Sequence, residues 1–191
     1  MALPTRAEAH VTLEGHVRDA YQRYHAEMVG TAVEGYAARF GGDPNLWYVT
    51  GLLHDIDFEE HPDVHPARSL EWFREWGYPE ELIHAVEAHA YDYNGFTTLP
   101  QTPLAAAVMA CDELCGIIYA YKQLNPIAYG AMKASSIKKR FDEPRFAAKI
   151  KREDILRGCA HLGIPLDEHI SNVLRALARL DTGVVSGESP T

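Results

Sequence analysis

The chain carries apolar residues at every third or fourth position along most of its length, and glycine and proline interrupt this spacing at intervals. Such spacing is typical of helices that bury one face. It predicts helices over residues 17–40, 44–55, 66–77, 79–91, 103–124, 151–163 and 167–180. No stretch alternates apolar and polar residues between turn signals, as a half-buried strand does. The sequence therefore predicts an all-α bundle of roughly seven to nine helices.

The length of 191 residues suits one domain, since domains average about 150 residues. We expect this domain to span residues 1–181. The last ten residues, TGVVSGESPT, are small and polar, and they predict a flexible tail over 182–191.

Membrane and secretory signals are weak in this sequence. There is no run of 18 apolar residues, and the first residues, MALPTRAEAH, lack the apolar stretch of a secretory signal. Three cysteines are too few for a disulfide framework. We therefore expect a cytoplasmic protein without a membrane partner.

Charge is distributed unevenly along the chain. Residues 1–132 carry 7 Lys or Arg against 19 Asp or Glu, whereas residues 133–191 carry 11 against 8. The net charge of −9 disfavours a nucleic-acid polymer as partner. An acidic, histidine-containing part followed by a basic stretch favours a cation site beside a site for a small anion. The alternative is a solvated basic helix.

The strongest local signal is the pair His54–Asp55 at the end of an apolar helical pattern. Neighbours on a helix point about 100° apart, so the two side chains can meet one metal only near the end of the helix. Alone the pair means little, but four more candidate ligands accompany it: His25, His65, His89 and Asp112.

Asp112 is the hardest of these residues to explain without a metal. It lies within the long apolar stretch 103–124. A carboxylate buried there without a partner costs several kcal/mol, so a metal or a fixed cation is the usual compensation. A buried ion pair with Arg or His is the alternative for Asp112. For His25 and His65, the alternatives are a core histidine and a loop histidine.

Four imidazoles and two carboxylates form a mixed nitrogen and oxygen set. Such a set suits Fe, Mn, Zn, Co or Ni and is too rich in nitrogen for Ca or Mg alone. Six protein ligands also exceed what one catalytic metal accepts, so one or two divalent ions are expected, with Asp55 as the bridge between two. His61 could replace His65 as a metal ligand. Cys111 and Cys115 are expected to pack in the core as small apolar side chains.

The order His25, His54–Asp55, His65, His89, Asp112 resembles the HD-domain metal-dependent phosphohydrolase superfamily. Its pattern is a His, an HD pair, one or two further His and then an Asp, all on the helices of one bundle. The segments HPARSLEWFREWGYPEELIHAVEAHA and SSIKKR…FAAKIKREDILRGCAHLG also resemble a subgroup of small stand-alone predicted HD hydrolases. The resemblance implies a single-domain HD-type bundle, with a metal-site core at about 20–120 and C-terminal helices at 133–181.

The resemblance also implies hydrolysis of a small phosphorylated metabolite or nucleotide by a metal-bound hydroxide. The same ligand set serves di-iron oxygenases that resemble myo-inositol oxygenase or organophosphonate oxygenase, and this remains the alternative activity. A catalytically inactive binding module is a third reading, which the intact ligand set disfavours. The tyrosines of the N-terminal helix leave a homodimer open.

One departure from the family concerns phosphate binding. Many HD phosphodiesterases read HDIGK, whose lysine approaches the phosphate, but this chain reads HDIDFEE, and it lacks the HD-GYP signature. We expect Ser136, Lys138 and Lys139 to bind the anionic substrate instead, with an exposed basic helix as the alternative. Beside Asp55, we expect Glu59 or Asp57 to act as proton shuttle or as an anchor for a ligand.

Overall fold

The computed structural model describes residues 3–182 as helices joined by short connections, with no strand in this range. The all-α class is therefore confirmed. The elements are α1 (Arg6–His16), α2 (Ala20–Phe40), α3 (Pro44–Leu53), α4 (Ala67–Glu75), α5 (Glu80–His89), α6 (Pro103–Leu124), η1 (Tyr129–Ala131), α7 (Ala134–Phe141), α8 (Arg152–Leu162), α9 (Leu166–Leu177) and η2 (Ala178–Thr182). The flexible tail predicted at 182–191 lies outside the described residues from 183 onward.

Local sequence explains where the central helices begin and end. Gly41 ends α2 in the left-handed conformation, with φ of 68°, which glycine adopts without strain. Asp43 then caps α3 by accepting a hydrogen bond from the Leu46 N–H, and Pro44 occupies the first turn. Thr102 caps α6 in the same way, through the Ala105 N–H. The boundary between α2 and α3 is thus fixed by the turn residues that predicted it.

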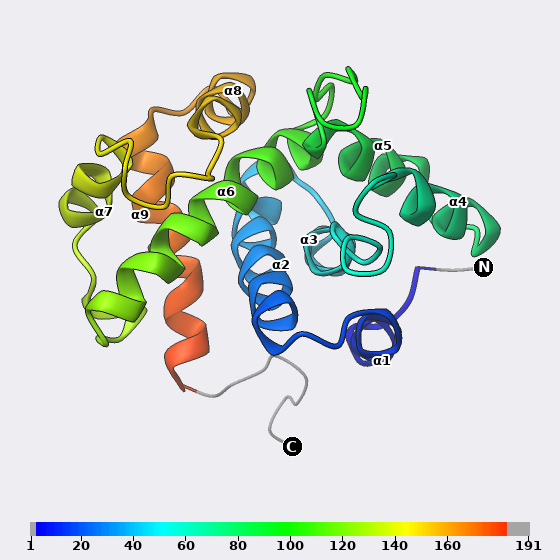
Figure 1. Ribbon diagram of the computed structural model, residues 1–191, viewed down its shortest axis with the longest axis horizontal. Coiled ribbons are helices and arrows are strands. Elements are labelled where there is room, and N and C mark those ends of the chain that lie inside the picture. The colour runs from blue at the N-terminus through cyan, green and yellow to red at the C-terminus, as the bar shows by residue number, and fades with distance from the viewer. Residues whose placement is uncertain (1–2, 183–191) are drawn as a thin grey trace.

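Helices α2 and α6 form the centre of the molecule (Figure 1). On one side, α1, α3, α4 and α5 enclose a core built around Leu52, Phe73 and Val86. On the other side, α8 and α9 pack on α6 and α2 around a larger core. The metal-ligand candidates of α2, α5 and α6 therefore lie near the junction of the two cores.

Two helices were not predicted as separate elements. The expected helix over 17–40 starts only at Ala20, because α1 ends at His16 and Val17 to Asp19 make the connection. The sequence signal for α1 is its capping box, in which Thr5 and Glu8 bond each other's main-chain N–H groups. Helix α7 is also present, at the basic stretch for which the sequence left a helix open.

Helix α6 is long and apolar enough to cross a membrane by length and composition alone. However, 72% of its most apolar 18-residue window is buried inside the protein. That burial is what a central core helix requires, and it explains why so long a helix is so apolar.

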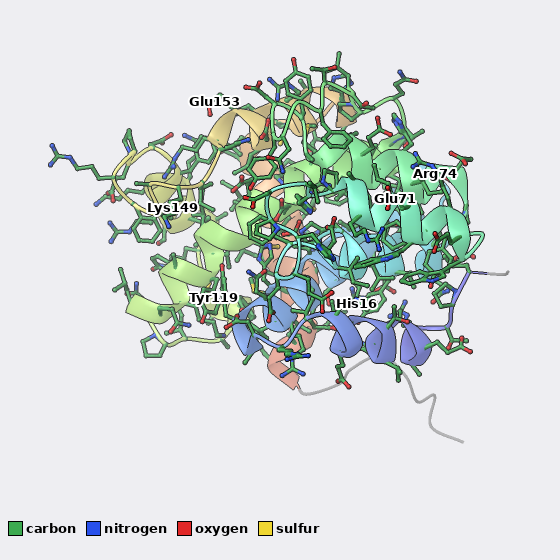
Figure 2. All side chains as sticks on the ribbon, turned by 45° about the vertical axis from the view of Figure 1, so that its right-hand side comes forward. His16, Glu71, Arg74, Tyr119, Lys149 and Glu153 are labelled. Carbon is green, nitrogen blue, oxygen red and sulfur yellow. The ribbon has the colours of Figure 1, made fainter. Side chains whose placement is uncertain are left out.

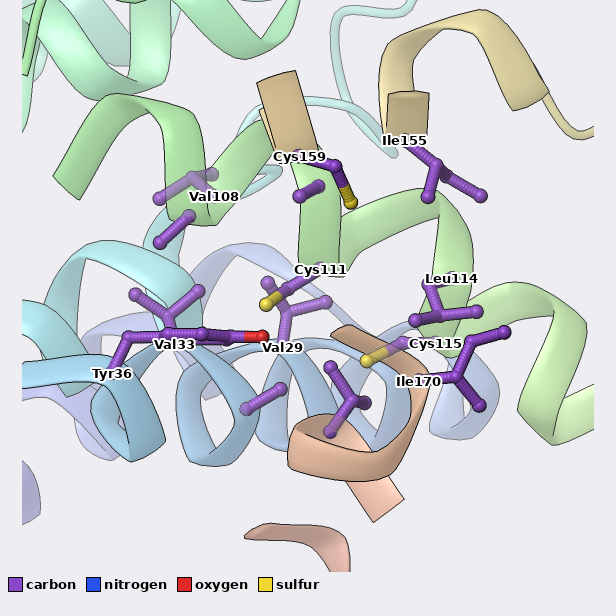
Figure 3. Packing of buried hydrophobic residues seen from close by; sticks show 14 of the residues in the cluster. Val29, Val33, Tyr36, Val108, Cys111, Leu114, Cys115, Ile155, Cys159 and Ile170 are labelled. Atoms are coloured by element: carbon purple, nitrogen blue, oxygen red, sulfur yellow. The ribbon is translucent and has the colours of Figure 1, made fainter. Parts of the chain in front are cut away.

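The larger core contains all three cysteines (Figure 3). Cys111 and Cys115 on α6 and Cys159 on α8 are buried with Val29, Leu114 and Ile170. Burial raises the pKa of each thiol, so these cysteines pack as small apolar side chains rather than as thiolates. This matches the packing role expected for Cys111 and Cys115.

The larger core also encloses one histidine, His169 of α9. Its Nε2–H donates to the main-chain oxygen of Ala110 at 2.9 Å, and its Nδ1 accepts from the Tyr36 hydroxyl at 2.7 Å. The ring is therefore neutral in the folded state. Burial lowers the pKa of His169 from 6.5 to about 4.

This buried histidine predicts acid sensitivity. Because the unfolded state binds the proton first, the stabilisation is complete above pH 6.5 and is lost as the pH falls toward 4. The free energy of unfolding should fall over this range by about 3 kcal/mol more in the wild type than in His169→Gln, which cannot titrate. Urea unfolding of metal-free protein at several pH values measures this, and parallel curves would contradict it.

Candidate metal centre

The six residues predicted as metal ligands meet at one place, although they come from five parts of the chain. His25 lies in α2, His89 is the last residue of α5, and Asp112 is midway along α6. His54 directly follows the end of α3, and Asp55 comes next. The end of α3 at Leu53 therefore frees the HD pair from a regular helix, so that both side chains face the same centre. His65 comes from the segment between α3 and α4.

The polar atoms of these residues form two adjoining groups. In the first, the Asp112 Oδ1 lies 2.8 Å from His25 Nε2 and 3.3 Å from His54 Nε2. In the second, Asp55 Oδ1 lies 3.2 Å from the Nε2 atoms of both His65 and His89. Asp55 also reaches the first group, because its Oδ2 lies 3.4 Å from His54 Nε2. The two oxygens of Asp55 therefore face different histidines.

Hydrogen bonds on the far side of the rings set the orientation of three histidines. His54 Nδ1–H donates to the main-chain oxygen of Gly51 at 2.8 Å, and His65 Nδ1–H donates to Asp57 at 2.6 Å. His89 Nδ1–H donates to the main-chain oxygen of Val86. Each bond leaves the Nε2 lone pair directed at the centre, as metal-ligating histidines require.

The centre has the properties of a cation site. His54 Nε2 is buried and has no hydrogen-bond partner, although the carboxylates of Asp55 and Asp112 lie close by. Burial alone would lower the pKa of His54, but the attraction of these two carboxylates raises it to about 9. The surroundings thus favour a positive charge at this nitrogen.

The neighbouring histidines also shift the pKa of the two carboxylates, Asp55 and Asp112. Burial opposes their ionisation, but the attraction of His54 and hydrogen bonds from the other histidines hold the pKa of Asp55 and of Asp112 well below the usual range. Three sets of donors have their ligand atoms within 4.8 Å of one another: His25–His54–Asp55, His54–His89–Asp112 and Asp55–His65–His89. The residues present therefore fit a divalent metal.

Asp57 supports the centre without facing it. Its side chain is fully buried and accepts hydrogen bonds from His65 Nδ1–H at 2.6 Å and from the Ser69 N–H at 3.0 Å. Of the two roles weighed for this residue, the geometry matches the anchor of a ligand and not the proton shuttle.

Glu59 lies away from the centre. Its carboxylate accepts from the main-chain N–H groups of Arg18 and Asp19, both at 2.9 Å. It thereby holds the connection between α1 and α2 and does not line the cavity beside the metal-ligand candidates. The expectation that Glu59 takes part in the chemistry therefore has no geometric support.

A cavity of about 450 Å³ opens onto the centre. Five of the six candidate ligands line it, and only His54 does not. The other lining residues come mainly from α2, α6, the segment after α5 and the segment that leads into α8: Tyr21, Gln22, Phe58, Ala90, Tyr93, Glu113, Gly116, Lys149, Ile150, Lys151 and Asp154. Its volume is that of a small-molecule site.

The three residues expected to bind the substrate are not among those that line the cavity. Ser136, Lys138 and Lys139 lie on α7, and Lys138 pairs with Asp142 at 2.5 Å on that helix. The placement of the anion site on these residues is therefore corrected. The basic stretch does reach the cavity, but through Lys149 and Lys151.

Glu113, which follows Asp112 and lines the cavity, was not predicted from the sequence. Burial, followed by the charge of Asp112, raises its pKa to about 8. Its position next to a predicted ligand was the only available signal. For Lys149 and Lys151 the signal was the excess of basic residues, which indicates a segment but not which of its side chains face the cavity.

In the described residues, four histidines and two aspartates from an all-α bundle gather beside a cavity and could hold a metal ion. Residues 23–117 match the family model described as HD domain, and they contain all six candidate ligands. The chain is therefore a member of the HD-domain superfamily, whose members are generally metal-dependent hydrolases. Searches of curated proteins and of solved structures return no match.

The contact between Asp57 and His65 yields a prediction for metal binding. In Asp57→Asn the side chain keeps its size but loses the charge that orients His65. Metal affinity should fall about 10- to 100-fold, as for other partners of metal-ligating histidines. Calorimetric titration with Mn²⁺ or Zn²⁺ measures this. Glu59→Gln serves as the control and should bind as the wild type does, and equal affinities for both variants would contradict the prediction.

Proposed function

We propose that the protein is a metal-dependent phosphohydrolase that acts on a small phosphorylated metabolite or nucleotide. The observation that carries the proposal is the position of Asp55, whose two oxygens face two different histidine groups. A carboxylate in this position is suited to bridge two metal ions, and two ions can hold both the attacking and the leaving oxygen of a phosphate ester.

The donor groups indicate which residues would hold each ion. His25, His54 and Asp112 would hold one ion, and His65 and His89 the other, with Asp55 shared between them. Bound divalent ions would polarise the phosphoryl oxygens and lower the pKa of a water molecule toward neutrality. Fe, Mn, Zn, Co and Ni all suit these donors.

The protein itself positions the substrate. Three imidazole rings of the centre, those of His54, His65 and His89, are held by hydrogen bonds from their Nδ1–H groups to Gly51, Asp57 and Val86. The aromatic rings of Tyr21, Phe58 and Tyr93 form walls of the cavity and exclude water from part of the bound molecule. A cavity of about 450 Å³ suits a metabolite or a mononucleotide better than a polymer.

The experiment is metal analysis followed by an activity screen. Protein purified without chelator should contain up to two transition-metal ions per chain, and it should release inorganic phosphate from one or more small phosphate esters. Chelation should abolish this activity, and Mn²⁺, Co²⁺ or Ni²⁺ should restore it. Iron content with oxygen uptake and no phosphate release would instead support the oxygenase alternative. A metal content near zero would support an inactive binding module. The cytoplasmic location and the homodimer stay predictions from the sequence.

A further inference from the structure

We propose that Lys149 and Lys151 form a second anion-binding site in the cavity, so that the substrate carries another anionic group besides the phosphate at the metal centre. This rests on the proposed function for the first phosphate. The substrate class is then a small phosphate ester whose remaining part bears a carboxylate or a further phosphate.

Two basic side chains of the stretch 133–152 line the cavity, those of Lys149 and Lys151. Residues 133–152 hold eight Lys or Arg. Lys138 and Arg140 pair with Asp142 and Glu143, both at 2.5 Å. Lys149 and Lys151 form no ion pair within 4.0 Å with any acid in the described part of the chain. Both line the cavity, so a ligand there would meet two charges that no acid neutralises at salt-bridge distance.

The segment that carries these lysines is held in place by hydrogen bonds. It connects α7 and α8 without regular structure, as Figure 2 shows around Lys149. Arg152 fixes it by donating to the main-chain oxygens of Phe141 at 2.7 Å, Phe146 at 2.6 Å and Glu143 at 3.1 Å. A site on an ordered segment binds more tightly because less entropy is lost on binding.

Packing beneath the lysines fixes the same segment from inside. Ile150, which lies between them, rests on Gly116 of α6, where a Cβ would come within 2.6 Å of its Cδ1 atom. The absence of a side chain at Gly116 therefore makes room for Ile150. With Ile150 seated on α6, its two neighbours are kept at the rim of the cavity.

Contacts across the cavity further define the position of Lys151. Its Nζ lies 5.2 Å from the centre of the Tyr93 ring and 3.4 Å from the main-chain oxygen of Asp92, both on the segment after α5. Asp154, an acid on the same wall, pairs with Arg157 at 2.5 Å. This acid near the two lysines thus already has a partner.

The test uses two probes of nearly equal size, glycerol 3-phosphate and 3-phosphoglycerate. They share the phosphate, but only the second has a carboxylate on the remaining part. Calorimetric titration of Mn²⁺-loaded protein measures the affinity for each probe, and phosphate release is measured separately. We expect the wild type to bind 3-phosphoglycerate about tenfold more tightly than glycerol 3-phosphate, because a charge-assisted contact is added.

The variant Lys149→Gln/Lys151→Gln should lose this preference and bind the two probes with equal affinity. Lys139→Gln removes a charge from the same basic stretch outside the cavity and should keep the preference. A wild type without preference, or a preference that survives in Lys149→Gln/Lys151→Gln or disappears in Lys139→Gln, would overturn the proposal. A preference that depends on the two lysines, found without phosphate release, would support the second anion site while refuting the proposed hydrolysis.

Discussion

Replacing Asp55 by alanine is expected to remove metal-dependent phosphate release almost completely, by about 10³-fold or more in kcat. Asp55 is the one residue whose oxygens contact both histidine groups, at 3.4 Å from His54 and 3.2 Å from His65 and His89. Its loss removes a ligand from both proposed ions together. Metal analysis of the purified variant should therefore show a lower metal content alongside the lost activity.

A matched control separates this effect from a change in fold. Asp63 lies in the same segment between α3 and α4, but it is exposed and does not line the cavity. Asp63→Ala should keep both metal content and activity, and circular dichroism should show equal helix content in the two variants. Full metal occupancy in Asp55→Ala, with activity near the wild-type value, would refute the bridging role.

The sequence was sufficient for most of the helices and for the six residues of the candidate metal centre, for different physical reasons. Helical spacing is local, and Gly41, Asp43 and Pro44 encode the turn between α2 and α3 through their own conformational preferences. The centre was predictable because a carboxylate such as Asp112 is costly to bury in an apolar core helix without a partner. The order of the six residues, which resembles the HD domain, was the second signal.

The positions of Glu59, Lys149 and Lys151 were not predictable in this way. Glu59 is close to Asp55 in sequence, but the chain turns after Asp57 and carries Glu59 to the N–H groups of Arg18 and Asp19. Lys138 and Lys149 look equivalent in a basic stretch. Only the hydrogen bonds of Arg152 and the contact of Ile150 with Gly116 determine which of them reaches the cavity. These are contacts between residues distant in sequence, which local patterns do not contain.

The approach of α2 to α3 leads to the second large effect, a loss of stability in Gly51→Ala. A Cβ at Gly51 would lie 2.8 Å from Gly30 Cα, 2.9 Å from Gly30 N and 2.9 Å from the main-chain oxygen of Val29. All three atoms belong to the backbone of α2, so no side chain can rotate to make room and the helices must separate. Overpacking of this kind costs about 3 kcal/mol.

The same displacement should reach the metal centre, because the main-chain oxygen of Gly51 accepts the hydrogen bond that orients His54. Urea unfolding should therefore show the lower stability, and metal titration a weaker affinity. Gly15→Ala is the matched control, since Gly15 lies in exposed α1 with nothing within 4 Å of an added Cβ. There alanine should stabilise the protein by about 0.5–1 kcal/mol, because it favours the helix more than glycine does. If Gly51→Ala stabilised the protein as Gly15→Ala does, helix propensity rather than the close contact of α2 with α3 would govern Gly51.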